Sequence, residues 1–450
     1  MHRVVQLFCA AIILTALTTA PAESQRNGIR LVRDAEIENI IRGYSTPIFN
    51  AAGLSAEDVN IHLVRDNRLN AFVAGGQRLF INTGLLMRAE DPNAVIGVIA
   101  HEAGHIAGGH LARIQDELRN AELKSILAAV VGIAVGAATG DGAAAGTIIR
   151  GRQGAAITDL LKYSRTQESA ADAAALKYLD ATGQSARGIS EFFRLLQADI
   201  RLQGGREHPY LSSHPLTNDR ISVVDNHVAL SRFADAQVPR QQIIDHQMMR
   251  AKLIGFMQPL ASVLRIFPET NNSVPARYAR STAFYLEGNL AKSIPLIDGL
   301  IAQAPKNPYF HELKGQMLFE NGRIEQSLGP YRKSVELAPE EPLLRTALAR
   351  AQIETEDQAL LEEASTHLEA AAGREPDMRE IWRLTTIVNG RLGRRGEMAL
   401  AQAQFEILGG EYVAARTLAD RAIDQLPVGS PGWLRAQDIR ADAQQRINSR

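Results

Sequence analysis

One short segment, "AHEAGHIAGGH" at residues 100–110, holds three of the chain's 11 histidines and one glutamate. His101 and His105 are four residues apart, so on a helix their imidazoles lie on one face, one turn apart. Two imidazoles in that arrangement can bind one zinc ion through nitrogens about 2.0–2.1 Å from it. Glu102 lies beside them, where it can take a proton from a metal-bound water. The spacing predicts a catalytic zinc site; two exposed histidines paired by chance are the alternative.

A catalytic zinc site needs a third protein ligand. A third histidine continuing the motif would stand six residues after His105, where the chain has Leu111. His110 misses that register by one residue and, at about 100° per helical residue, is predicted to point away from His105. We interpret His110 as structural and bonded to a backbone carbonyl. A carboxylate from a second helix is the other common solution for the third ligand.

The segment "YSRTQESAADAAALKYL" offers such a carboxylate. Glu168 and Asp172 are four residues apart on one face of a small-residue helix, which can pack closely on the first helix. We predict Glu168 as the third zinc ligand. Asp172 is predicted to accept the outer N–H of a ligating histidine and to fix its tautomer. The alternative is a solvated face paired with Arg165 or Lys177, against which the surrounding alanines argue.

A small sheet is expected to precede the histidine helix. Two β-rich runs, "VNIHLVRD" and "LNAFVA", are followed by Gly75-Gly76 and a third run, "QRLFIN", at residues 77–82. The glycine pair between two β-rich runs predicts a hairpin. The run at 77–82 is a candidate edge strand, on which backbone hydrogen bonds could hold an extended substrate.

The helix that carries the histidines is predicted to start at Asp91-Pro92, a cap followed by a first-turn proline, and to continue through Ile114. Beyond it, residues 126–149 are rich in Gly, Ala and other apolar residues. Residues 126–138 are entirely apolar, but this run is too short to cross a bilayer, which needs about 20 apolar residues. We expect a buried or interfacial helical hairpin; a hydrophobic flap near a substrate groove and a peripheral membrane contact are the alternatives.

The C-terminal part of the chain repeats with a period of 34 residues, the separation of Gly288 from Gly322. Glycine at the helix–helix turn and proline after the second helix are typical of tetratricopeptide repeats. Four helix pairs are expected from about Arg277 to Leu426. The third pair is degenerate, because Glu356 stands where glycine is expected. Such a solenoid offers a concave surface to a protein partner.

Composition limits the class of protein. The chain has 450 residues, of which 45% are hydrophobic and 22% charged, so two or more ordinary globular domains are expected. Aromatic residues make up only 5%, and helix formers are abundant, which predicts a mainly α fold. The net charge of -1 gives no electrostatic reason to expect nucleic acid as a partner.

Residues 1–22 resemble a secretory signal peptide, with one early arginine, an apolar stretch and the small-residue site Ala20-Pro21-Ala22. Cleavage near Ala22 would place the mature chain in the periplasm; an uncleaved membrane anchor is the alternative. The only cysteine, Cys9, would be removed. Any metal in the mature chain must then be held by histidine and carboxylate.

Three segments in this order, "HEAGH", "ESAADAAALKYL" and "SSHPLTNDRI", resemble the zinc metallopeptidase family that includes the integral-membrane protease HtpX. The signal peptide and trailing repeats resemble the periplasmic branch of that family. The resemblance covers nearly the whole mature chain. It implies a zincin-like α+β peptidase domain with one Zn²⁺ per chain, in which His101, His105 and Glu168 bind the metal and Glu102 is the general base.

The resemblance also marks two residues of the third segment. It implies that His214 is a fourth, displaceable metal ligand that keeps the enzyme latent. A hydrogen-bond donor to the transition state and a purely structural histidine are the alternatives for His214. Arg220 matches the arginine after the His-Pro motif and is expected to support the site.

These observations predict a signal peptide at 1–22, a metallopeptidase domain at 23–230, a helical linker at 231–276 and a repeat domain at 277–450. The predicted function is zinc-dependent proteolysis of unfolded or misassembled proteins in the periplasm. The resemblance implies outer-membrane β-barrel substrates, with the repeats docking their assembly machinery. A second interpretation is a periplasmic chaperone or adaptor with a proteolytically silent zinc site. A third is an integral-membrane protease.

Overall fold

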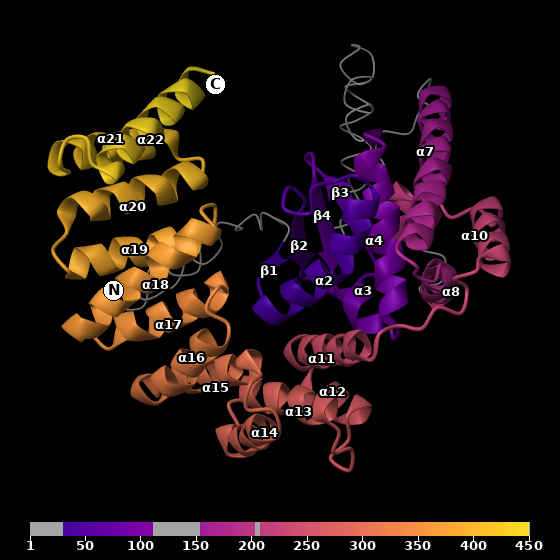
Figure 1. Cartoon of the computed structure of the whole chain (residues 1–450), viewed down its shortest axis with the longest axis horizontal. Helices are drawn as coiled ribbons and strands as arrows, with labels where there is room; N and C mark the ends of the chain where they lie inside the picture. Colours follow the sequence, from indigo (N-terminus) through magenta and orange to yellow (C-terminus); the bar gives the residue numbers. More distant parts are fainter. Residues whose placement is uncertain (1–29, 111–153, 203–207, 450) are drawn as a thin grey trace, which may run out of the picture.

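The computed structural model describes residues 30–110, 154–202 and 208–449. In this part of the chain, a small sheet surrounded by helices is followed by a curved array of paired helices that runs to the C-terminus (Figure 1). The predicted mainly α architecture, with a small sheet and a helical solenoid, is confirmed. The predicted signal peptide and the apolar stretch at 126–149 lie outside the described residues. No helix within the described ranges is long and apolar enough to cross a bilayer.

The sheet has four strands, which are β1 (Leu31–Val32), β2 (Asn60–Val64), β3 (Ala71–Ala74) and β4 (Arg78–Asn82). Their spatial order is β1-β2-β4-β3, with β2 and β4 parallel and the other two pairs antiparallel. Gly75 and Gly76 both have positive φ, 59° and 95°, in the turn between β3 and β4. Because glycine adopts such angles without steric cost, this turn forms the predicted hairpin.

The prediction that residues 77–82 form an edge strand is wrong. β4 lies inside the sheet, paired with β2 on one side and β3 on the other. In the parallel pairing with β2, Asn60 is opposite Arg78 at one end and Val64 is opposite Asn82 at the other. No local sequence pattern predicts this pairing. β3 is the strand at this edge, and it lies beside the helix that carries the histidines.

The helices around the sheet are α2 (Ala35–Ala51), α3 (Thr83–Arg88), α4 (Pro92–Ala107), α7 (Gly154–Ala181), α8 (Arg187–Leu202), α9 (Pro209–Ser213) and α10 (Asn218–Leu230). The α4 helix begins as predicted, because the Asp91 side chain accepts a hydrogen bond from the backbone N–H of Asn93 and Pro92 occupies the first turn. It is apolar on nearly every side and is buried by contacts with α2, α7 and α8. A helix of this kind belongs in the core of a domain.

The prediction that this helix continues through Ile114 is wrong, since α4 ends at Ala107. Gly108 caps the helix, and Gly109 has a φ of 62°, in the left-handed region that favours glycine. The two glycines therefore turn the chain sharply just before His110.

The connection predicted as helical contains α11 (Arg240–Met257) and α12 (Leu260–Ile266). Met249, Leu253 and Ile254 of α11 belong to the same buried apolar cluster as side chains of α2 and α4. The α11 helix also packs against α13, the first helix of the array. The connection is thus a packed layer between the two parts of the molecule.

The array consists of α13 (Val274–Leu286), α14 (Leu290–Gln303), α15 (Pro308–Glu320), α16 (Ile324–Leu337), α17 (Pro342–Glu354), α18 (Gln358–Arg374), α19 (Arg379–Arg391), α20 (Arg395–Leu408), α21 (Tyr412–Gln425) and α22 (Pro431–Asn448). The expectation of four pairs ending at Leu426 is wrong, because α21 packs against α22 as a fifth pair. The next 34-residue step after Pro376 falls on Gly410 and not on a proline. The proline spacing therefore gives no sign of the last helix pair.

The degenerate third repeat keeps the geometry of its neighbours. Glu356 has a φ of 60°, close to the 72° of Gly288 and the 74° of Gly322 at the equivalent turns. It is the only residue other than glycine with positive φ among the described residues. A left-handed conformation costs a residue with a Cβ roughly 1–2 kcal/mol, so helix packing overrides the local preference here.

A buried charge cluster joins the sheet-bearing part to the array. Lys252 of α11 is only 1% exposed, and its Nζ lies 2.8 Å from Asp34, 3.3 Å from Glu36 and 3.7 Å from Glu312. The Tyr278 hydroxyl donates to Glu36 at 2.7 Å. Three carboxylates from both parts of the chain therefore share one ammonium group, which ties the start of α2 to the first repeats.

Candidate metal centre

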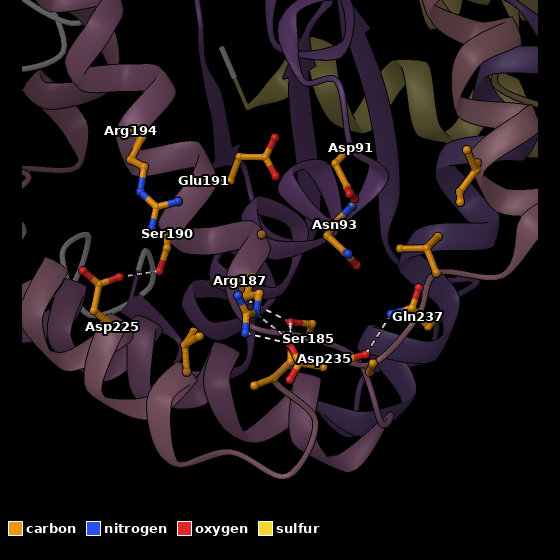
Figure 2. A pocket seen from close by; sticks show the side chains of 16 residues that line it. Asp91, Asn93, Ser185, Arg187, Ser190, Glu191, Arg194, Asp225, Asp235 and Gln237 are labelled. Carbon is orange, nitrogen blue, oxygen red and sulfur yellow. Dashed lines mark hydrogen bonds and ion pairs between the residues drawn. The ribbon is translucent and has the colours of Figure 1, made fainter.

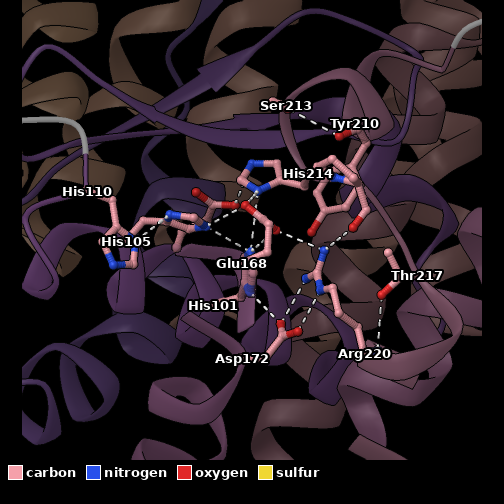
Figure 3. A network of polar contacts seen from close by, with 12 residues as sticks. His101, His105, His110, Glu168, Asp172, Tyr210, Ser213, His214, Thr217 and Arg220 are labelled. Atoms are coloured by element: carbon pink, nitrogen blue, oxygen red, sulfur yellow. Dashed lines mark hydrogen bonds and ion pairs between the residues drawn. The ribbon is translucent and has the colours of Figure 1, made fainter. Parts of the chain in front are cut away.

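Four side chains from three helices converge next to the sheet (Figure 3). His101 and His105 project from α4, Glu168 from α7, and His214 follows α9 as its C-terminal cap. One ligand atom of each lies within 4.8 Å of the others. His105 is half-buried and the other three are buried. The structure thus brings together the three predicted ligands and the histidine of the His-Pro motif.

Close packing of α4 on α7 makes this convergence possible. A Cβ added to Gly104 would lie 2.8 Å from the carbonyl oxygen of Ala171 and 3.0 Å from its Cα. Only glycine at position 104 permits that approach. Glu168 and Asp172 flank Ala171 on α7 and are therefore carried into the histidine face of α4.

The distances within the cluster suit a shared cation. His101 Nε2 lies 3.1 Å from His105 Nε2 and 3.3 Å from Glu168 Oε2. The other Glu168 oxygen lies 3.2 Å from His105 Nε2 and 3.0 Å from His214 Nδ1. Ligand atoms on a tetrahedral zinc ion are roughly 3.3–3.4 Å apart when each bond is about 2.0–2.1 Å. The observed separations match that requirement.

The carboxylate of Glu102 is fully buried, and neither of its oxygens accepts a hydrogen bond from any residue in the described ranges. His214 Nε2 lies 3.5 Å from Glu102 Oε1. Burial raises the pKa of Glu102. An orphaned carboxylate is costly in the interior, and a divalent cation nearby would stabilise its charged form. The donor set and this orphaned group together fit a bound zinc ion.

Asp172 and Arg220 form a supporting layer around the cluster (Figure 3). His101 Nδ1 lies 2.8 Å from Asp172 Oδ1, which leaves Nε2 of the same ring aimed at the other ligands. Arg220 donates to Asp172 through Nε at 2.6 Å and Nη2 at 2.9 Å, and its Nη1 lies 2.9 Å from Glu168 Oε2. Arg220 also donates to the carbonyl oxygen of Pro215 at 2.8 Å and so ties down the loop of His214.

Burial and the neighbouring side chains shift the pKa values of the cluster residues in different directions. Burial acts to lower the pKa of His101, but hydrogen bonds with Asp172 and Glu168 outweigh it and raise that pKa to about 10. Burial lowers the pKa of His105 to about 3. For Glu168, burial acts to raise the pKa, and the surrounding histidines overcome it and hold the pKa far below its usual range. The ionised carboxylate is the form that binds a metal.

The His214 loop is held by residues that sequence reasoning missed. The Tyr210 ring stacks on the His214 ring at a centroid distance of 4.8 Å, and the Tyr210 carbonyl accepts the backbone N–H of His214 at 2.7 Å. At the other end of α9, His208 Nε2 lies 3.0 Å from Asp199, which also contacts Arg88. The four-residue spacing of Tyr210 and His214 is a local signal for their contact. No local signal relates Asp199 to this loop.

The prediction that His110 points away from His105 is wrong. Its Nδ1 lies 3.0 Å from the Nδ1 of His105, and its ring is 6% exposed. An unbroken helix would turn His110 away from His105, whereas the glycine turn after Ala107 brings His110 back toward the helix end.

A cavity of about 450 Å³ lies between the start of α4, the start of α8 and the chain after α10 (Figure 2). Ser190 donates to Asp225 at 2.7 Å, and Arg187 donates to Asp235 at 2.7 Å across it. These contacts join neighbouring elements. None of the metal-cluster residues lines this cavity.

Comparison with known proteins gives the sequence context of the cluster. Residues 31–228, which include every residue of the cluster, match peptidase family M48. A beta-barrel assembly-enhancing protease of Escherichia coli O157:H7 is 22% identical over 439 residues, which cover 94% of this chain and 86% of that protein. Metalloprotease YcaL of Escherichia coli strain K12 is 28% identical over 177 residues, 39% of this chain and 65% of YcaL. A relative in Vibrio cholerae is 23% identical over 296 residues, 63% of this chain and 59% of that protein.

Proposed function

We infer the function from the premise that residues 31–228 belong to peptidase family M48 and retain its metal site, which makes this chain a zinc metallopeptidase. We propose that it is a periplasmic endopeptidase that cleaves misfolded or misassembled proteins. The observation that carries this proposal is the convergence of His101, His105 and Glu168 beside the buried, unpaired carboxylate of Glu102.

His101, His105 and Glu168 would hold the zinc ion through Nε2, Nε2 and the carboxylate. Zinc bound there supplies a Lewis acid that polarises a peptide carbonyl and makes a water molecule nucleophilic near neutral pH. Glu102 would take the proton of the attacking water and return it to the leaving amine. Because the buried carboxylate accepts no hydrogen bond from any residue in the described ranges, it stays basic enough to take that proton.

The position of β3 supports an extended polypeptide as the substrate. This strand is at the edge of the sheet and lies beside α4. An extended chain can pair with such an edge through backbone hydrogen bonds, which read little sequence. Pairing of that kind selects unfolded segments over folded domains, as a protease for misassembled proteins requires.

The position of His214 supports latency. Its Nδ1 lies 3.0 Å from Glu168 and 3.4 Å from His101, and its Nε2 faces Glu102. The ring therefore lies between the proposed metal ligands and the proposed base, where the attacking water has to be. We propose that His214 is a fourth ligand that must move before peptide hydrolysis, with Asp172 and Arg220 holding the remaining residues in place.

The similarity to a beta-barrel assembly-enhancing protease over 94% of this chain supports outer-membrane β-barrel proteins as substrates. We propose that the repeat domain, 277–450, docks the machinery that assembles them. The signal peptide, 1–22, would be removed near Ala22, and the metallopeptidase domain would span 23–230. The segment 231–276 would connect the two domains and pack on both.

Casein digestion by the purified full-length protein tests the enzymatic proposal, with zinc content measured in the same samples. Glu102→Gln should keep its zinc and lose roughly 10²–10⁴-fold in rate, as loss of a general base does. Equal digestion by both proteins would overturn the role of Glu102. His214→Ala should digest casein faster than the wild type; a slower rate would favour transition-state stabilisation by His214.

The alternative function is that of a periplasmic chaperone or adaptor with a silent zinc site. The observation in its favour is the same placement of His214 between the ligands and Glu102. It predicts zinc-loaded protein that does not digest casein even when His214 is replaced by alanine, and that still prevents aggregation of an unfolded β-barrel protein. Digestion that depends on Glu102 would exclude it.

A further inference from the structure

The two histidines of α4 differ in what holds the outer nitrogen of each ring. His101 has the carboxylate of Asp172 at 2.8 Å from its Nδ1. For His105 the corresponding atom faces Nδ1 of His110 at 3.0 Å, with the two rings nearly perpendicular at 82°. A ligand histidine whose outer nitrogen has no fixed partner is free to rotate away from the metal.

The proton count assigns the roles in this contact. A neutral imidazole that binds a metal through Nε2 carries its single proton on Nδ1, so His105 Nδ1 is a donor. The facing Nδ1 of His110 must then be the acceptor, which places the His110 proton on its own Nε2. We propose that His110 is a positioning residue that accepts the outer N–H of His105 and keeps Nε2 of His105 directed at the metal.

The chain around His110 is shaped to seat its ring. A Cβ on Gly108 would lie 2.5 Å from His110 Nε2 and 2.8 Å from its Cδ2, so only glycine leaves room for the ring over the end of α4. Gly109 supplies the left-handed turn, with a φ of 62°. One glycine is enough to end a helix. Here two consecutive glycines meet separate structural requirements, and both directly precede the buried His110.

This proposal rests on the proposed zinc site. Two substitutions of His110 test it, because only one of them keeps a hydrogen-bond acceptor. In His110→Asn, the side-chain oxygen can take the place of Nδ1 as an acceptor. In His110→Leu, the side chain fills similar volume and accepts nothing. The zinc dissociation constant of each full-length protein is measured by competition with a chromogenic chelator. Loss of an outer partner typically weakens metal binding about 10–100-fold, so we expect this loss for leucine and a change below about 3-fold for asparagine.

Wild-type zinc affinity in His110→Leu would overturn the proposal, and so would equal losses in the leucine and asparagine variants. Thermal unfolding of the zinc-free proteins is the control for a merely structural role, and the two variants should unfold within a few degrees of each other. A larger difference between their melting temperatures would mean that misfolding causes the loss of zinc, and it would also count against the proposal.

A spectroscopic measurement tests the same point without substitution. In the zinc-loaded wild type, ¹⁵N NMR of the imidazoles should show the His110 proton on Nε2 and the His105 proton on Nδ1. A proton on His110 Nδ1 would overturn the assignment. These readouts are independent of proteolysis: zinc binding that follows the predicted order in a protein unable to digest casein would refute only the proposed function.

Discussion

Gly104→Ala tests the packing on which the metal centre depends. The new methyl group would be placed 2.8 Å from the carbonyl oxygen of Ala171, a backbone atom that cannot rotate out of the way. Ordinary contact at such positions begins at 3.4 Å, so α4 and α7 must separate locally by about 0.6 Å, the difference between the two values. Overpacking of this kind costs about 1–3 kcal/mol, which exceeds the roughly 0.5–1 kcal/mol gained by replacing glycine within a helix.

The same displacement moves Glu168 and Asp172 away from the histidines of α4. We therefore expect Gly104→Ala to lose zinc affinity as well as stability, with a melting temperature lower by several degrees at roughly 2–4 °C per kcal/mol. Calorimetry of the zinc-free protein measures the loss of stability, and chelator competition measures the loss of zinc affinity.

Gly43→Ala is the matched control. Gly43 lies within α2 of the same domain, and a Cβ there would meet nothing within 4 Å. This variant should be stabilised by roughly 0.5–1 kcal/mol and should bind zinc like the wild type. If Gly104→Ala behaved as Gly43→Ala does, close packing of α4 on α7 would not be what assembles the site.

Three further predictions concern the supporting residues and the repeats. Asp172→Ala removes the partner of His101 and should weaken zinc binding about 10–100-fold in the chelator assay; unchanged affinity would refute the role of Asp172. Glu356→Gly relieves a left-handed φ and should raise the free energy of unfolding by about 1 kcal/mol, measured by urea denaturation, whereas a decrease would show that the Glu356 side chain stabilises the turn. Burial raises the pKa of Glu312 to about 7, above its ordinary 4.5. The folded state then binds more protons than the unfolded state between those two pH values, so this group makes the free energy of unfolding fall as pH rises through that window. Urea titrations at pH 5 and pH 7.5 should show a smaller fall for Glu312→Gln than for the wild type, and identical falls would contradict the assignment.

Local sequence periodicity accounts for most of the structural features that the sequence predicts correctly. The spacing of His101 and His105, the cap at Asp91 and the hairpin at Gly75-Gly76 each follow from backbone geometry within a few residues, and all three are present. Glu168 could be reached because the chain offers a second small-residue helix with carboxylates at helical spacing. The 34-residue period likewise reports a unit that repeats its own local contacts.

Prediction failed where distant segments decide the outcome, and where a regular local pattern was extended past a break in the helix. β4 became an inner strand because β2 pairs with it in parallel, and no pattern within residues 77–82 carries that information. His110 turned back to His105 because two glycines end the helix, which a periodicity argument treats as continuous. The array has five helix pairs where four were predicted, because helix packing, and not proline spacing, defines a repeat.

The sequence by itself determined which side chains could bind a metal and on which helices they stand, because residue type and helical spacing are local properties. Only the tertiary structure decided that those helices approach closely enough at Gly104 and Ala171 for the side chains to meet. It also decided that His214 lies among them, and that Lys252 joins the repeats to the sheet-bearing part of the chain. These contacts join residues far apart in the chain, and they form because the free energy, which falls when apolar surface is buried and buried charges are paired, is minimised over the whole molecule at once.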